Sequence, residues 1–301
     1  MQTPKIHAAL MTQNELTDLR DNVALLLPWV DSITVVDGGS MDLTIPFMRA
    51  WSSVEPKLRF FIHSWSDNFP QQRNNVLRRV AEVAAGGDWL LFVDPDEFLD
   101  LPTLQSLRRL PAVVYNKRER YCRVGFKCRS VTLRGPQRVW ENHDDYHKGL
   151  LIRWSPALQY GHDGEGAVHE VLRGADPIYY TGHHPEFPAF WYEHRKQENI
   201  IWPRGLRNFF IGGGGKNLGS KNPSWVELRT ITDRIGFRGW HEFLRYLIAG
   251  NIDAALKDFL VRHRHERGSD GASEVREGYK AYFRLWHPEE EPQELRGEAI
   301  E

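Results

Sequence analysis

The fold of this chain is decided by Trp89-Leu90-Leu91-Phe92-Val93-Asp94-Pro95-Asp96-Glu97, an apolar run that passes directly into an acidic turn. A second run, Ser32–Val36, leads in the same way into Asp37-Gly38-Gly39-Ser40-Met41-Asp42. Short apolar runs rich in β-branched and aromatic residues are typical of buried strands in a parallel sheet. Ligands of open α/β sheets bind beyond the carboxyl ends of such strands. The sequence therefore predicts two carboxylate-bearing loops at one sheet edge, able to hold a nucleotide and a divalent metal.

Strands and helices alternate through the first hundred residues. The predicted strands are Ile6–Met11, Ser32–Val36, Leu58–Ile62 and Trp89–Val93, and the predicted helices are Asn14–Leu27, Leu43–Trp51 and Gln71–Ala85. This alternation is typical of a parallel sheet that helices cover, and hence of the α/β class.

After the first hundred residues, the predicted strands and helices no longer alternate. Further strands are predicted at Tyr121–Lys127, Val131–Arg134 and Leu150–Trp154, and helices at Trp225–Ile235, Trp240–Ala249, Ile252–His265 and Ser273–Leu285. A run of four glycines from Gly212 indicates a loop or linker. We expect one domain over residues 1–210, a Gly-rich linker over 211–222, a helical extension over 223–288 and an acidic disordered tail over 289–301.

Composition limits the class of protein. A hydrophobic content of 41% in 301 residues supports an ordinary packed core, and a net charge of -1 gives no overall attraction to DNA or anionic membranes. Cys122 and Cys128 are predicted to share one strand face as unpaired thiols, which suits a reducing cytoplasm. No signal peptide or apolar run of membrane-spanning length is recognised, so a cytoplasmic location is expected.

The acidic turn after Val93 has the composition of a metal site. Residues two apart in an extended segment point the same way, so Asp94 and Asp96 are expected to converge on one cation. Mg²⁺ and Mn²⁺ prefer hard oxygen ligands and leave coordination positions for phosphate oxygens. The alternative is a plain acidic turn with solvated carboxylates. Asp37 has a similar pair of interpretations: a hydrogen bond to a base or ribose, or a cap on its own turn.

Four motifs in order resemble those of the family 2 glycosyltransferases of GT-A fold. They are Thr12-Gln13-Asn14-Glu15, Val35–Thr44, Gln72-Arg73-Asn74 and Asp88–Glu97. A weaker match continues at Ala167-Val168-His169-Glu170 and Gly182-His183-His184, strings similar to those of a branch that includes lipopolysaccharide-core glycosyltransferases. The resemblance implies a GT-A type nucleotide-diphospho-sugar transferase fold, with a Rossmann-like, mixed and mostly parallel sheet, here followed by a C-terminal helical extension.

The resemblance also implies roles for individual residues. Donor contacts fall on Asn14, Glu15, Asp37, Gly39, Arg73 and Asp94, and metal ligands on Asp94, Asp96, His169 and His184. Glu170 is the candidate general base, because direct displacement needs a carboxylate that takes the acceptor proton, and Asp163 and Glu165 are its rivals. The metal would be Mn²⁺ or Mg²⁺, and the donor a nucleoside-diphosphate sugar, with a UDP-sugar favoured. His183 and His184 have a structural interpretation as well.

The predicted function is a metal-dependent, inverting, hexosyltransferase-type glycosyltransferase that acts on a glycan, lipid-linked glycan or similar hydroxyl acceptor. One alternative is a phage-type DNA glycosyltransferase acting on a hydroxymethylated base. It would use the basic stretch Lys117–Arg138, which is otherwise the solvent face of a strand pair or a patch for an anionic acceptor. Another alternative is a non-catalytic sugar-nucleotide binding module. A nucleotidyltransferase is disfavoured, since Met11–Glu15 stands where a basic, Gly-rich loop is expected.

Overall fold

The computed structural model describes residues 4–66, 68–115, 121–134, 137–162, 170–181, 190–197, 206–207, 209–210, 223–262 and 280. The chain divides into two compact units. The first contains Met1–Ser66, Gln71–Gly161 and Val171–Lys196, and the second contains Asp67–Pro70, His162–Glu170 and Gln197–Glu301. The finer division expected from the sequence, with a linker over 211–222 and a tail over 289–301, stays a prediction.

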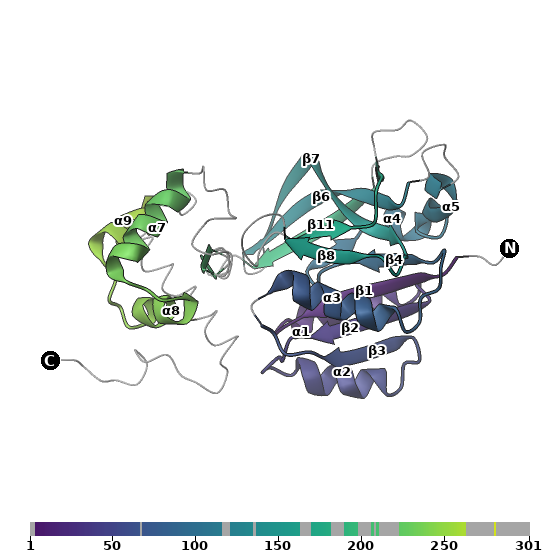
Figure 1. Cartoon of the computed structure of the whole chain (residues 1–301), viewed down its shortest axis with the longest axis horizontal. Helices are drawn as coiled ribbons and strands as arrows, with labels where there is room; N and C mark the ends of the chain where they lie inside the picture. Colours follow the sequence, from purple (N-terminus) through teal and green to yellow (C-terminus); the bar gives the residue numbers. More distant parts are fainter. Residues whose placement is uncertain are drawn as a thin grey trace. The chain divides into compact units, whose positions relative to one another are not determined.

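The strands lie in the first half and middle of the chain, and Figure 1 labels most of them. They are β1 (Ile6–Thr12), β2 (Ser32–Asp37), β3 (Leu58–Ile62), β4 (Trp89–Phe92), β5 (Glu97–Leu99), β6 (Arg123–Arg134), β7 (Gln137–Arg153), β8 (Gln159–His162), β9 (Glu170–Arg173), β10 (Ile178–Tyr180) and β11 (Trp191–Gln197). The helices among them are α1 (Leu16–Leu26), α2 (Thr44–Ser52), α3 (Phe69–Val80), α4 (Leu101–Ser106) and α5 (Leu110–Tyr115).

One mixed sheet organises the first unit. Its described strands follow the order β3-β2-β1-β4-β7-β6-β11-β5, with β10 also paired to β6. The four strands from β3 to β4 are parallel, whereas β7 runs antiparallel to both β4 and β6. The expected α/β class, with a mixed and mostly parallel sheet, is therefore confirmed. β8 and β9 form a separate two-stranded sheet.

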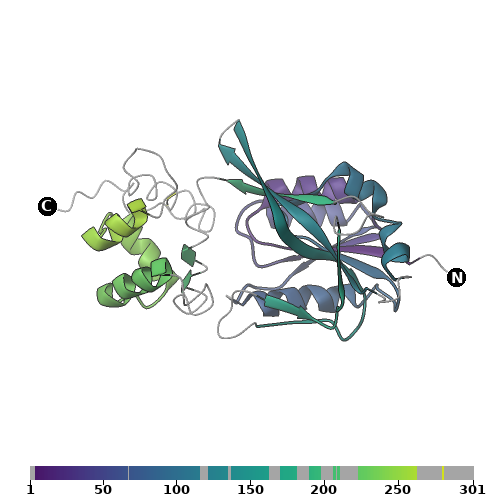
Figure 2. The same ribbon diagram turned by 90° about the horizontal axis from the view of Figure 1, so that it is seen from above.

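The parallel strands β1, β2 and β4 are buried on both faces because helices cover both, whereas the edge strand β3 is only partly buried. Ala8 and Leu10 of β1 pack in one apolar cluster with Leu19 and Val23 of α1. Ala9, on the opposite face of the same strand, packs in another cluster with Val76 and other residues of α3. Figure 2 shows α1 (purple) and α3 (blue) on opposite sides of the sheet. This arrangement brings the carboxyl ends of β1, β2 and β4 to one edge.

The predicted elements of the first hundred residues are all present, and their ends differ slightly. The largest difference is helix α3, which ends at Val80 rather than Ala85. After Val80 the bonding changes, because the N–H groups of Glu82 and Val83 donate to carbonyls three residues earlier, at 3.4 and 3.0 Å. Asp88 then closes a turn by accepting the Ala85 N–H on Oδ2 at 2.8 Å and donating its own N–H to the Ala85 carbonyl at 3.1 Å.

The middle of the chain departs further from expectation. The short helices α4 and α5 were not predicted, although Asp100 caps α4 by accepting the Thr103 N–H at 2.9 Å. The two predicted strands at 121–127 and 131–134 are one strand, β6, and its partner β7 extends from Gln137 to Arg153. Cys122 lies just before β6 and is partly buried, whereas Cys128 is buried within the strand, and the two cysteines form no disulfide with each other.

The second unit is helical in its C-terminal part. It contains α7 (Pro223–Ile235), α8 (Trp240–Ile248) and α9 (Ala254–Arg262), which confirms a helical C-terminal part and three of the predicted helices. Their core includes Leu228, Phe243, Leu247 and Phe259. The predicted helix Ser273–Leu285 and the glycine run lie outside the described residues, apart from Lys280. In the part of the chain that is described, no helix has the length and apolar character needed to span a membrane.

Candidate functional site

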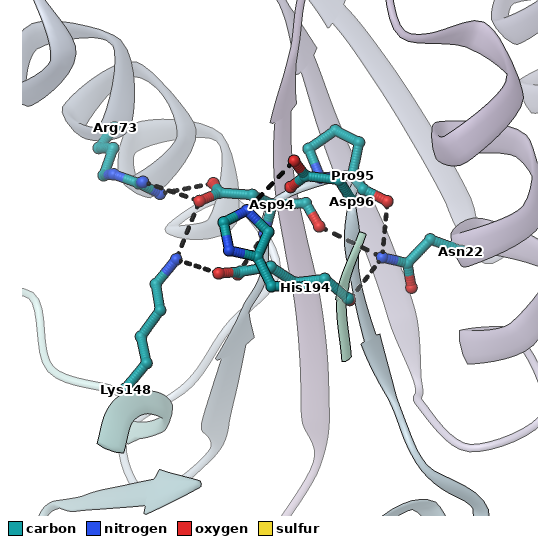
Figure 3. Close-up of polar contacts among 8 residues, drawn as sticks. Asn22, Arg73, Asp94, Pro95, Asp96, Lys148 and His194 are labelled. Atoms are coloured by element: carbon teal, nitrogen blue, oxygen red, sulfur yellow. Dashed lines mark hydrogen bonds and ion pairs between the residues drawn. The ribbon is translucent and has the colours of Figure 1, made fainter. Parts of the chain in front are cut away.

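The acidic segment after β4 is a tight turn rather than an extended strand. The Glu97 N–H donates to the Asp94 carbonyl at 3.0 Å, which closes a four-residue turn. The expected extended backbone is therefore absent, alternation of side chains does not apply here, and the convergence of Asp94 and Asp96 on one cation stays a prediction. Their carboxylates contact different partners (Figure 3).

Asp94 is held by two cations. Arg73 on α3 donates Nη1 to Oδ1 at 3.0 Å and Nη2 to Oδ2 at 3.2 Å, a bidentate pair. Lys148 donates Nζ to the same Oδ2 at 2.9 Å. The Arg73 guanidinium also lies over two rings, with Cζ 5.0 Å from the centroid of Phe92 and 5.6 Å from that of Tyr160. Both the position and the charge of Asp94 are thus fixed by the protein.

Strand register explains why Lys148 reaches the turn. β7 runs antiparallel to β4 with Leu91 opposite Leu151. If this register is continued by three residues, forward from Leu91 and backward from Leu151, Lys148 lies opposite Asp94, just beyond the carboxyl end of β4. There Nζ also donates to Glu97 Oε1 at 2.6 Å, and Glu97 Oε2 accepts the Asp94 N–H at 2.9 Å. Lys148 therefore bridges the two carboxylates at either end of the turn.

Burial and the neighbouring charges shift the pKa values of Asp94, Glu97 and Lys148. Burial alone would raise the pKa of Asp94, but the charges of Arg73 and Lys148 outweigh it and hold that pKa well below its usual range. Burial raises the pKa of Glu97 in spite of the Lys148 charge. The carboxylates Asp94 and Glu97 overcome the burial of Lys148 and raise its pKa. Asp94 and Lys148 are therefore ionised at neutral pH.

Asp96 faces an imidazole. Its side chain is largely buried, and Oδ2 lies 3.3 Å from Nε2 of His194 on β11, a strand paired with β5. A carboxylate oxygen and an imidazole nitrogen suit Mn²⁺, so this pair fits two ligands of the expected metal. Asp94 accepts one bond on Oδ1 and two on Oδ2, so Oδ1 keeps a lone pair, and the role of Asp94 as a metal ligand stays a prediction. Within the described ranges, no group of three or more His, Cys, Asp or Glu could hold a metal.

The buried side-chain amide of Asn22 also holds the acidic turn, through hydrogen bonds to its backbone. Asn22 on α1 donates Nδ2 to the carbonyls of Asp94, Pro95 and Glu97 at 3.2, 3.1 and 2.8 Å. Asn22 is fully buried. The turn is therefore fixed through its backbone as well as through its side chains.

The loop after β2 lies at the same sheet edge. Asp37 is fully buried, and its carboxylate accepts the N–H groups of Gly39 and Ser40 at 2.7 and 2.6 Å and the Ser40 hydroxyl at 2.6 Å. Burial raises the pKa of Asp37, and the bonds from Ser40 oppose the rise. This is the capping geometry that the sequence left open beside base recognition. Gly39 has a φ of 93°, which explains the glycine there.

Asn14 joins the first two loops. Its N–H donates to the Ser40 hydroxyl at 2.7 Å, and its Oδ1 accepts the Met41 N–H at 2.7 Å. Asn14 has a φ of 55°, a left-handed conformation that asparagine tolerates. Its Nδ2 is buried and has no hydrogen-bond partner in the described structure. Glu15 lies at the N-cap position of α1 and makes no side-chain cap there.

The motif at 72–74 fastens α3 to its surroundings. Gln72 donates to the His63 carbonyl at 3.0 Å, after β3, and Arg73 holds Asp94 after β4. Asn74 forms a pair of bonds with Tyr160, donating Nδ2 to its carbonyl and accepting its N–H, both at 2.8 Å. Each residue of the motif thus reaches a different segment of the first unit.

Other predicted residues are placed less fully. Asp163, Glu165, His169 and His184 lie outside the described residues, and Glu170 begins β9 with a partly buried side chain. In the basic stretch, Lys127 and Arg129 lie over the Trp191 ring, and Arg123 pairs with Asp176 at 3.4 Å. These three cations have local partners, as expected for the face of a strand pair.

Sequence reasoning missed three residues of the site, namely Lys148, His194 and Asn22. Lys148 and His194 come from strands far along the chain, and no local motif marks either of them. Asn22 carries a weak signal, because it is a polar residue on the apolar face of α1 between the buried residues Leu19 and Val23. A buried amide on a core-facing stripe implies a buried partner.

Comparisons with known proteins give remote similarities. A comparison with protein-family models finds no match, and neither does a comparison with curated proteins. Among solved structures, the chain is similar to S. aureus TarS 1-349 in complex with UDP-GlcNAc, at 14% identity over 94% of this chain and 81% of that one, with a TM-score of 0.42. It is similar at 14% identity to the mannosyltransferase PcManGT from Pyrobaculum calidifontis in complex with GDP-Man and Mn2+, over 96% and 82% of the chains, with a TM-score of 0.41. A 4-diphosphocytidyl-2C-methyl-D-erythritol synthase matches 50% of this chain and 75% of its own, at 14% identity and a TM-score of 0.35. At this level of similarity the chain is not assigned to any of their families.

Proposed function

We propose that this chain is a glycosyltransferase of GT-A type that moves a sugar from a nucleoside-diphosphate sugar to an acceptor hydroxyl. One observation carries the proposal. At the carboxyl end of β4, the acidic turn presents Asp94 fixed by Arg73 and Lys148, and two residues later Asp96 faces His194. This edge of the sheet is where open α/β folds bind nucleotides, and the same loops carry the glycosyltransferase-like motifs.

The divalent cation is assigned to Asp96 and His194 in this proposal. They offer one oxygen and one nitrogen ligand side by side, and the donor diphosphate would supply further oxygens. When bound, Mn²⁺ or Mg²⁺ would neutralise charge on the departing diphosphate. Asp94 stays a candidate contact of the sugar nucleotide and a candidate metal ligand, since its Oδ1 accepts only one hydrogen bond, from Arg73, in the described structure. The histidines His169 and His184 stay candidate ligands from the sequence.

The nucleoside is assigned to the loops after β1 and β2. Asn14 holds a buried Nδ2 donor there without a partner in the described structure, which is a suitable group for a base or ribose oxygen. Asp37 accepts the N–H groups of Gly39 and Ser40 and so fixes the shape of the loop. In this proposal Asp37 supports nucleoside binding by holding that loop in position. Glu15 stays a candidate contact.

Transfer itself is proposed as a direct displacement that inverts the anomeric centre. The acceptor oxygen bonds to the anomeric carbon while the bond from that carbon to the diphosphate oxygen breaks. The electron pair leaves with the nucleoside diphosphate, and the acceptor proton passes to a carboxylate base. Glu170 is the first candidate for this base, and Asp163 and Glu165 are the alternatives.

A donor screen tests the proposal. The melting temperature of the full chain would be measured with UDP-GlcNAc, GDP-Man, a CMP-sugar and a dTDP-sugar, each with and without Mn²⁺. A glycosyltransferase should be stabilised by one donor class and should release the nucleoside diphosphate from it. Formation or consumption of pyrophosphate would instead indicate a nucleotidyltransferase. Stabilisation without turnover would favour the binding module, and retarded duplex DNA at high salt would favour the DNA-modifying alternative.

A further inference from the structure

We propose that Lys148 is a ligand of the donor diphosphate and carries part of the charge stabilisation of the leaving group. This inference rests on the proposed function. It concerns a residue from the antiparallel part of the sheet that no motif in the sequence identifies.

The first argument is the hydrogen-bonding capacity of the ammonium group. A lysine ammonium has three N–H donors. In the described structure one donates to Asp94 Oδ2 at 2.9 Å and another to Glu97 Oε1 at 2.6 Å, and the third has no partner. The Lys148 side chain is 28% exposed, compared with 4% for Glu97. The Lys148 side chain is thus partly exposed beside a buried carboxylate, and a ligand oxygen at the remaining N–H would complete the three bonds of the ammonium.

The second argument concerns charge. Asp94 and Glu97 alone would repel the phosphate oxygens of a donor at this edge. Arg73 already forms a bidentate pair with Asp94, so Asp94 does not need Lys148 for neutralisation. Lys148 is therefore a second cation at the same carboxylate. It removes the repulsion and leaves the edge able to accept a diphosphate beside the Asp96–His194 pair.

The third argument concerns geometry during transfer. The Asp94 and Glu97 bonds hold Nζ from two sides, so it is positioned before the donor arrives. Charge develops on the diphosphate as the bond to the anomeric carbon breaks, and a fixed cation stabilises that charge without reorganisation. The ammonium keeps its proton throughout, and the electron pair remains on the leaving nucleoside diphosphate.

The test compares affinities for UDP, GDP, dTDP and their nucleosides by calorimetry in buffer with Mn²⁺. In Lys148→Gln, affinity for the preferred nucleoside diphosphate should fall about tenfold or more, because a cationic contact is lost, while affinity for the nucleoside should not change. Lys148→Arg should recover part of the affinity. Lys257→Gln, which changes an exposed lysine of α9, is the matched control and should bind as the wild type does.

A second variant separates ligand binding from a structural role. Lys148→Gln leaves Glu97 buried without its cation, so the variant could lose folded protein for that reason alone. Glu97→Gln/Lys148→Gln removes both charges and should regain stability, yet it should still bind the diphosphate weakly. Wild-type diphosphate affinity in this double variant would overturn the proposal and leave the proposed function intact. If the wild-type chain binds none of UDP, GDP and dTDP, both the proposal and the proposed function are overturned.

Discussion

Lys148 and Asp94 face each other where the antiparallel part of the sheet begins, with Nζ 2.9 Å from Oδ2 (Figure 3). The pair joins β7, the first antiparallel strand, to the turn that follows β4, the last parallel one. Because β7 runs antiparallel to β4, a residue far along the sequence meets the turn after β4 at the edge that carries the candidate site. The candidate site therefore depends on both halves of the sheet.

Asp96→Asn should reduce sugar transfer by about 100-fold or more, because a metal contributes several kcal/mol and each 1.36 kcal/mol is tenfold in rate. The substitution keeps the shape of the side chain, so the unfolding transition in urea should change little. Initial rates of nucleoside diphosphate release, measured over a range of Mn²⁺ concentrations, check this. Unchanged turnover at all metal concentrations would exclude Asp96 from the mechanism.

Asn22→Ala should destabilise the first unit by about 1–3 kcal/mol, because three backbone carbonyls of the acidic turn lose the amide group that donates to them. Urea unfolding followed by fluorescence measures the change. Arg20→Ala, on the exposed face of the same helix, is the matched control and should have a small effect. Equal effects of the two substitutions would show that the amide does not support the turn.

Arg73→Lys keeps the charge next to Asp94 but loses the bidentate geometry and the contacts with the Phe92 and Tyr160 rings. We expect a loss of about 2 kcal/mol of folding stability, together with weaker donor binding. Calorimetric unfolding and donor titration check the two effects. Arg49→Lys, at an exposed position of α2, should change neither. Wild-type stability in Arg73→Lys would show that the bidentate pair between Arg73 and Asp94 does not stabilise the fold.

Glu170→Gln should lower kcat strongly and leave donor affinity unchanged if Glu170 takes the acceptor proton. A base contributes about 100-fold or more to proton transfer. Single-turnover rates and equilibrium binding of the donor separate the two quantities. Asp163→Asn and Glu165→Gln, tested in parallel, identify the base if Glu170→Gln retains turnover. A fall in donor affinity alone would instead assign Glu170 to the nucleotide site.

Stability should fall in acid through Asp88. Burial alone would raise the pKa of Asp88, but bonds from the Ala85 and Lys5 N–H groups and from His7 outweigh it and lower that pKa. A lowered folded-state pKa gives stability that is present above the unfolded value of about 3.9 and is lost as pH falls through the folded value. Asp88→Asn should be less stable near neutral pH and should lose less stability on acidification. Urea midpoints measured between neutral pH and about pH 3 check this. If the urea midpoints of the wild type and Asp88→Asn fell equally with pH, Asp88 would not be a source of the acid sensitivity.

The parallel half of the sheet could be predicted because its signals are local. Leu58–Ile62 was predicted with the observed bounds, since an apolar run between turn residues defines a buried strand without reference to distant residues. The antiparallel half could not be predicted in this way. Residues 137–149 of β7 carry many charged and polar side chains, and only pairing with β6 makes them a strand.

The residues of the candidate site show the same contrast between local sequence signals and long-range strand pairing. Asp94 and Asp96 follow an apolar strand and were identified from it, but the turn that carries them was not predicted, and neither were their partners. Lys148 and His194 depend on strand register and pairing, which single-sequence patterns do not specify. Residue identity at the strand ends was therefore predictable, and the contacts between the side chains were not.

The reciprocal bonds between Asn74 and Tyr160 have a consequence for Arg73. They attach the start of β8 to helix α3, the helix that carries Arg73. The Arg73 guanidinium lies over the Tyr160 ring, so a single helix fixes both partners of this contact. Neighbouring residues of one motif therefore hold the cation and the ring that it covers in a constant relative position.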